Sequence, residues 1–127
     1  MHIACCTPLC LKTRLTLPLT ITILENVASV GAYTKAGLEK LLEKYDIIGD
    51  VRGRGLFLSM ELVKDRALKT PDAKAAHQMA NLMKDEGVIL STHGRYNNAL
   101  KIRPPMTFNQ DNADQLLTAL DVCFSKL

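Results

Sequence analysis

An alternating stretch at residues 56–63 most limits what this chain can fold into. Side chains of a β-strand point to opposite faces in turn, so Leu56, Leu58, Met60 and Leu62 share one face of a predicted strand. That face is fully apolar, and it must be covered by a second layer of structure. The sequence therefore predicts a sheet that is packed on one side.

Three helices are predicted to supply the covering layer. Residues 24–45 carry apolar side chains along one face at helical spacing. A second helix is predicted to have Thr70 as its N-cap and Pro71 as its first residue, and to stop at Gly87. A last helix is predicted to follow Asn109, a residue type that caps helix N-termini.

The remaining strands are predicted to be short. They fall at residues 88–90 and 99–103, with an extra one at residues 47–51, while residues 91–98 read as a polar loop. Single strands mixed with single helices are typical of an α+β fold. We predict a two-layer sandwich in which a small, mostly antiparallel sheet is covered by helices. Residues 1–23 have no clear period, so we expect an irregular segment there and the domain at residues 24–127.

Composition argues against several classes of protein. A net charge of +3, evenly spread, does not indicate binding to nucleic acid or to a membrane surface. The longest uncharged apolar run, residues 15–24, is too short to span a bilayer. The four cysteines have neither zinc nor disulfide spacing. We therefore expect no metal site and a cytoplasmic protein with reduced thiols.

Few residues suggest catalysis. The Gly53-Arg54-Gly55 sequence precedes a strand and lacks the third glycine of a dinucleotide fingerprint, so we interpret it as a glycine-assisted turn. Arg52 and Arg54 could bind an anion, but we favour the interpretation that they pair with acidic side chains at the surface. Among the histidines, His93 in the predicted polar loop is the one that a ligand could approach. No catalytic residue is assigned.

The predicted strand at residues 99–103 carries the candidate site. Alternation places Lys101 and Arg103 on one face and Leu100 and Ile102 on the other. Two adjacent cations on a strand repel each other unless an anion meets them. The alternative is that both are solvated at the end of extended stems. The functional interpretation is that Lys101 and Arg103 form a binding site for a carboxylate or a phosphate.

Three stretches in register resemble a known family. They are IGDVRGRGLF at residues 48–57, ELVKD at residues 61–65 and LKIRPPM at residues 100–106. Together they resemble the carboxy-terminal small domain of class III aminotransferases, which are pyridoxal-phosphate enzymes of fold type I. The branch that the chain resembles most includes alanine–glyoxylate aminotransferase-like proteins and amino-alcohol phosphate phospholyases.

The resemblance implies transfer of an amino group between an amino acid or amine and a 2-oxo acid. In such enzymes a lysine of the large domain forms the Schiff base with pyridoxal phosphate, and an aspartate of that domain pairs with the ring nitrogen. Asp85-Glu86-Gly87 and Ser125-Lys126 look like those signatures, but both lie at predicted helix ends and we interpret them as coincidences. We expect an inactive fragment of a truncated or frame-disrupted gene, with non-native opening residues and no bound cofactor.

Two further expectations concern Lys101 and partners. Most class III enzymes have an arginine at this position to grip the substrate carboxylate, and a lysine, often found in this branch, provides a point charge instead. Without a large domain, the Phe57 and Val63 face and the first helix are expected to expose apolar surface, so we predict self-association or dimerisation. The alternative function is a free-standing α+β module that binds a ligand or RNA through Lys101 and Arg103.

Overall fold

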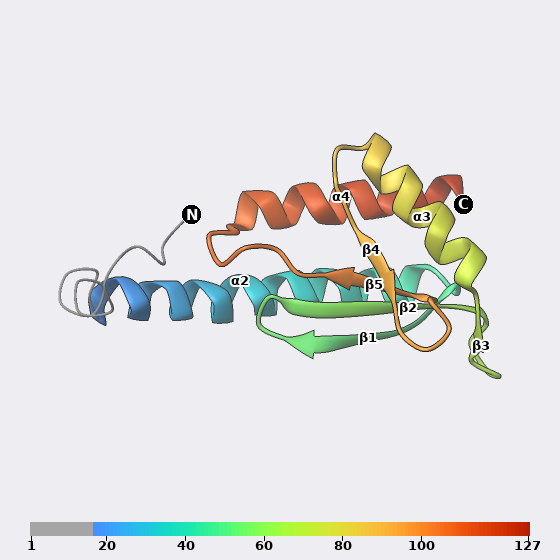
Figure 1. Ribbon diagram of the computed structural model, residues 1–127, viewed down its shortest axis with the longest axis horizontal. Coiled ribbons are helices and arrows are strands. Elements are labelled where there is room, and N and C mark those ends of the chain that lie inside the picture. Colours follow the sequence, from blue (N-terminus) through green and yellow to red (C-terminus); the bar gives the residue numbers. More distant parts are fainter. Residues whose placement is uncertain (1–16) are drawn as a thin grey trace.

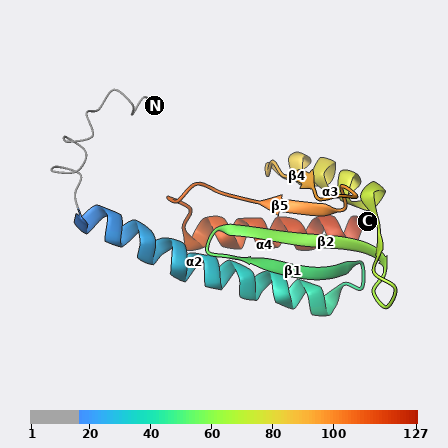
Figure 2. The same cartoon turned by 60° about the horizontal axis from the view of Figure 1, so that its bottom comes forward.

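The structure is a computed structural model that describes residues 17–127. Over these residues the predicted α+β sandwich is confirmed: an antiparallel sheet forms one layer and three helices form the other (Figures 1 and 2). The order of neighbouring strands in the sheet is β1-β2-β5-β4, and β3 pairs with β2 away from this path. The strands are β1 (Ile48–Arg54), β2 (Phe57–Asp65), β3 (Thr70–Pro71), β4 (Ser91–His93) and β5 (Ala99–Ile102).

The three helices cover one face of the sheet, behind the strands in the view of Figure 2. They are α2 (Leu17–Lys44), α3 (Ala73–Asp85) and α4 (Gln110–Lys126). The register places Met60 of β2 opposite Leu100 of β5, and both side chains are fully buried. The core therefore lies between the apolar face of β2 and β5 and the helices, as the alternation predicts. Its largest fully buried members include Leu38, Ile48, Leu58, Met60, Leu62, Met79, Met83, Leu100, Ile102 and Leu120.

The first helix is longer than predicted. It begins at Leu17, within the segment that we expected to be irregular. The rest of the predicted irregular segment, residues 1–16, lies outside the described residues.

The second helix begins at a different cap from the one predicted. Asp72 is the N-cap of α3, and its carboxylate accepts a hydrogen bond of 3.0 Å from the Ala75 amide. Thr70 and Pro71 instead pair with the end of β2 as β3. The prediction at Asn109 is confirmed, because the Asn109 side chain caps α4 in a capping box.

The strand predicted at residues 88–90 is wrong, and β4 starts at Ser91 within the predicted loop. The cause lies at the end of α3. The Val88 amide donates to the Met83 carbonyl at 2.8 Å, and Gly87 has a φ of +84°, so the residues after α3 close the helix end. The chain reaches β5 only at Ser91, which pairs with Lys101.

The turn between β1 and β2 confirms the glycine interpretation. Gly53 and Gly55 have φ values of +138° and +58°, which side chains rarely tolerate. Helix α2 crosses this turn at Gly31, where an added Cβ would lie 2.4 Å from the Gly55 carbonyl oxygen. The predicted strand at residues 47–51 is present as the longer β1.

A loop between β5 and α4 is tied to α2. Asn26 donates from Nδ2 to the carbonyl of Met106 at 3.0 Å and to that of Phe108 at 2.9 Å.

Cys123 is a free, buried cysteine, and burial raises the pKa of its thiol; the other cysteines lie outside the described residues. Within residues 17–127, no helix has the length and hydropathy of a membrane span, and no cluster of potential metal ligands was found.

Candidate functional site

The face of the sheet opposite the helices, called the outer face below, carries the polar side chains of the strands. Ser59 pairs with Arg52 of β1 on one side and with Lys101 of β5 on the other, so the three side chains point to the same face. The register adds further members of this face: Asp50, Arg54, Phe57, Glu61, Ser91 and His93.

Lys101 lies between two serines on the outer face. Its cross-strand neighbours are Ser59 on β2 and Ser91 on β4. Leu100 and Ile102 beside it are buried in the core, so the predicted alternation of this strand is confirmed. Among the residues that the structure describes, Lys101 has no carboxylate partner, and its charge is available to an anion.

Arg103 lies just beyond β5 and makes a different contact. Its guanidinium carbon is 5.4 Å from the centre of the Phe57 ring, which is a cation–π distance. Phe57 itself remains 57% exposed, as predicted, whereas Val63 is only 1% exposed. The exposure predicted for Val63 is therefore wrong: its side chain lies against Gly49 of β1, and its backbone pairs with Pro71 of β3, a strand that the sequence did not predict.

Lys101 and Arg103 both line one groove of about 610 Å³, which we name the strand-end groove. It opens beyond the Ser91–Lys101 pair, where β4 and β5 separate. Residues 87–91 form one side and residues 101–105 the other, and Phe108 with residues of α4 completes it. The lining is mainly apolar, and besides Lys101 and Arg103 its polar residues include Ser91, Thr107, Asn112 and Gln115.

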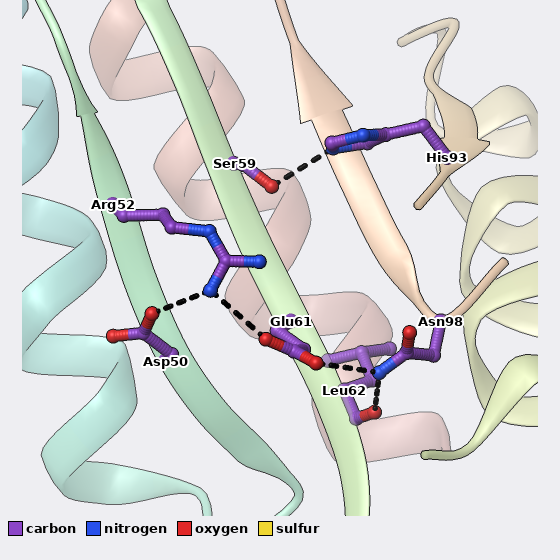
Figure 3. A network of polar contacts seen from close by, with 7 residues as sticks. All are labelled: Asp50, Arg52, Ser59, Glu61, Leu62, His93 and Asn98. Carbon is purple, nitrogen blue, oxygen red and sulfur yellow. Dashed lines mark hydrogen bonds and ion pairs between the residues drawn. The ribbon is translucent and has the colours of Figure 1, made fainter. Parts of the chain in front are cut away.

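A chain of polar contacts connects β1, β2 and β5 next to this site (Figure 3). Arg52 donates to Asp50 at 2.7 Å and to Glu61 at 3.0 Å, so the predicted surface pairing of Arg52 is confirmed. The hydrogen bond to Asp50, followed by that to Glu61, raises the pKa of Arg52. The other oxygen of Glu61 accepts from the buried amide of Asn98 at 3.1 Å.

His93 lies on a strand rather than in the predicted loop. Its Nε2 atom is 2.9 Å from Ser59 Oγ, so the imidazole bridges β4 and β2 (Figure 3). His77 is exposed on α3, and His2 lies outside the described residues. Sequence reasoning placed Ser59 on the polar face of its strand but missed its role, because only the strand register brings it to Lys101 and His93.

The two sequences that look like cofactor signatures meet each other at the surface. Lys126 Nζ lies 2.8 Å from Glu86 Oε1, and half of the Lys126 side chain is exposed.

Lys101 is the lysine of the strand-end groove, and no aspartate or glutamate lines that groove. Pyridoxal phosphate needs a lysine and an aspartate in one pocket, so the groove does not fit this cofactor without residues from elsewhere.

Comparison with known proteins identifies the family. The sequence model of the family described as Aminotransferase class-III matches residues 9–124. The chain belongs to the class III aminotransferases. The match begins before residue 24 and so includes part of the segment that we set apart from the domain.

Individual relatives of this class III chain carry two kinds of name. It is 48% identical over 103 residues to "Alanine--glyoxylate aminotransferase 2 homolog 2, mitochondrial" of Arabidopsis thaliana, a match covering 81% of this chain and 22% of the relative. It is 41% identical over 100 residues to "Ethanolamine-phosphate phospho-lyase homolog 1" of Caenorhabditis elegans, covering 78% and 21%. The chain thus spans about a fifth of the length of these curated relatives.

A solved structure agrees with these relatives. A phospholyase from Arthrobacter in complex with phosphoethanolamine matches with a TM-score of 0.81 and 29% sequence identity. The match covers 85% of this chain and 26% of the phospholyase chain. The resemblance predicted from the sequence is therefore confirmed, and the comparisons give no support to a free-standing ligand- or RNA-binding module.

Proposed function

We propose that this chain forms the substrate-binding side of a pyridoxal-phosphate-dependent enzyme of the class III family, acting on an amine or amino acid that carries an anionic group. The observation that carries this proposal is the position of Lys101 and Arg103 together at one groove, in a chain of this family. Neither residue has an acidic partner among the described residues, so each can meet a carboxylate or a phosphate.

The chemistry divides between this chain and the rest of such an enzyme. When bound, pyridoxal phosphate would stabilise the carbanion of an amino substrate. This chain supplies two cations and an apolar groove, and the Schiff-base lysine would come from the remaining part of the enzyme. Relatives named as a transaminase and as a phospho-lyase both fit this description, because the substrates of either can carry an anion. Amino acids and oxo acids remain the proposed partners, and the cytoplasmic location remains a prediction.

Anion binding by the chain tests the proposal. The ¹⁵N-labelled chain is titrated with inorganic phosphate and, separately, with acetate, while amide shifts are followed by NMR. We expect shifts at Ser91, Lys101 and Arg103, and about tenfold weaker binding for Lys101→Met, the effect of losing one charge-assisted contact. Lys126→Met is the matched control, because Lys126 is already paired with Glu86. Equal affinity of Lys101→Met and the unmodified chain would contradict the assignment.

A second measurement concerns the cofactor. We expect that mixing the chain with pyridoxal phosphate gives no stoichiometric internal-aldimine absorbance band, because the groove lacks the acidic partner that the ring nitrogen requires. A stoichiometric band that shifts on addition of an amino donor would show that the chain is active alone.

A further inference from the structure

The hydrogen bond between Ser59 and His93 crosses a complete strand. Neighbouring strands lie about 4.8 Å apart, so β2 and β4, which flank β5, are about 10 Å apart. The imidazole therefore has to lie over the outer face of β5 to reach Ser59 at 2.9 Å, as Figure 3 shows. The residue of β5 that faces His93 is Ala99, whose small side chain leaves room for the ring.

This path brings the imidazole to one side of Lys101. Lys101 follows Ala99 by one pleat on the same face of β5, and its direct neighbour on β2 is Ser59, the residue that His93 reaches. The imidazole ring thus fills the space on the side of Lys101 that faces Ala99. The Lys101 side chain can therefore extend only in the opposite direction along the strand, toward Arg103 and the strand-end groove.

The lining of the groove agrees with this direction. Lys101 lines the strand-end groove together with Ser91 and Arg103, whereas neither Ser59 nor His93 contributes to it. Among the described residues, the nearby carboxylate of Glu61 forms an ion pair with Arg52 and accepts from Asn98, and it forms none with Lys101.

We propose that His93, held by Ser59, is a positioning residue that directs the Lys101 ammonium into the strand-end groove. The inference rests on the proposed role of Lys101 in binding an anion and adds the device that orients it. A long side chain that is already oriented loses less conformational freedom when an anion binds. The same device serves a substrate carboxylate or phosphate, since it acts on the lysine rather than on the anion.

The test measures the order of the Lys101 side chain in the full chain by NMR relaxation of its ε-methylene group, assigned with Lys101→Met. We expect His93→Ala to increase the mobility of this group. His93→Gln should restore the order, because its amide can still reach Ser59. We also expect His93→Ala to bind inorganic phosphate and acetate about two- to tenfold more weakly, the cost of ordering one long side chain.

Controls separate positioning from loss of fold. Each variant must keep the ¹H–¹⁵N spectrum of the core residues, and His77→Ala, at an exposed histidine of α3, should leave the Lys101 signal unchanged. Unchanged Lys101 order in His93→Ala, or no recovery in His93→Gln, would overturn the proposal even where phosphate still binds. If Lys101 is ordered through His93 but no anion binds, positioning is supported and the proposed anion role of Lys101 fails.

Discussion

Asn98 and Leu62 are joined by two hydrogen bonds at the start of β5. The Leu62 amide donates to the Asn98 carbonyl at 2.8 Å, and Asn98 Nδ2 donates to the Leu62 carbonyl at 3.0 Å. The Asn98 side chain also donates to Glu61, and the residue is only 3% exposed. This pairing fixes the register of β5 against β2, and with it the position of Lys101 opposite Ser59.

Replacing Asn98 by alanine is expected to destabilise the domain by about 2 kcal/mol, because a buried carbonyl loses its side-chain donor and a carboxylate loses one partner. Urea unfolding followed by circular dichroism measures this change. Asn81→Ala, at an exposed position of α3, is the matched control and should shift stability by less than about 0.5 kcal/mol. Equal unfolding midpoints for the two variants would contradict the role of Asn98.

Gly31→Ala is expected to destabilise the domain by about 1–3 kcal/mol. The added methyl would lie 2.4 Å from the Gly55 carbonyl oxygen, and this backbone cannot move without opening the turn between β1 and β2. Thermal unfolding of the variant measures the effect, with Ala32→Ser at the exposed neighbouring position as the control. An unfolding temperature equal to that of the unmodified chain would mean that α2 does not pack closely against this turn.

Local signals predicted much of the fold. The alternation of residues 56–63 places Leu58, Met60 and Leu62 in the core, and Asn109 caps α4 as expected. Both features depend on residues close in sequence, either through the pleat of a strand or through the first turn of a helix. The same holds for the inward direction of Leu100 and Ile102.

Features that depend on distant residues were predicted poorly. Residues 88–90 have the composition of a strand, but their partner β5 comes later in the chain, and pairing with it begins only at Ser91. Thr70 resembles a helix cap, yet pairing with β2 makes it part of β3. The site shows the same limit, because Lys101 could be named from its own strand while Ser59 required the register.

Self-association is expected to depend on Ile89. This residue is 89% exposed and lies on the strand-end groove, so it extends an apolar surface that favours association. Sedimentation velocity over a range of concentrations should show a concentration-dependent species for the unmodified chain, and Ile89→Ser should shift it toward monomer. Leu68→Ser is the control, at a residue that is 77% exposed in the turn after β2. It tests whether the loss of any exposed apolar side chain reduces self-association to the same extent. A clean monomer at high concentration would contradict this expectation.

A carboxylate at the interface of α2 and α4 gives a pH-dependent prediction. Asp121 Oδ1 accepts hydrogen bonds from Lys44 Nζ at 2.6 Å and from the Tyr45 hydroxyl at 2.7 Å. The bond from Lys44, followed by that from Tyr45, lowers the pKa of Asp121, and the same carboxylate raises the pKa of Lys44. The two directions agree, since each charge stabilises the other.

The lowered pKa of Asp121 sets the direction of the effect. A carboxylate whose pKa is lower in the folded state contributes stability above its unfolded pKa of about 4, and this contribution is lost as the pH falls through the folded pKa. Asp121→Asn removes the charge while its carbonyl can still accept from Tyr45. We therefore expect this variant to be less stable than the unmodified chain at pH 7, with a difference that shrinks by pH 3. Urea midpoints at both pH values measure it, beside Glu39→Gln at an exposed position of α2. A difference of the same size at both pH values would show that Asp121 acts through packing rather than through its charge.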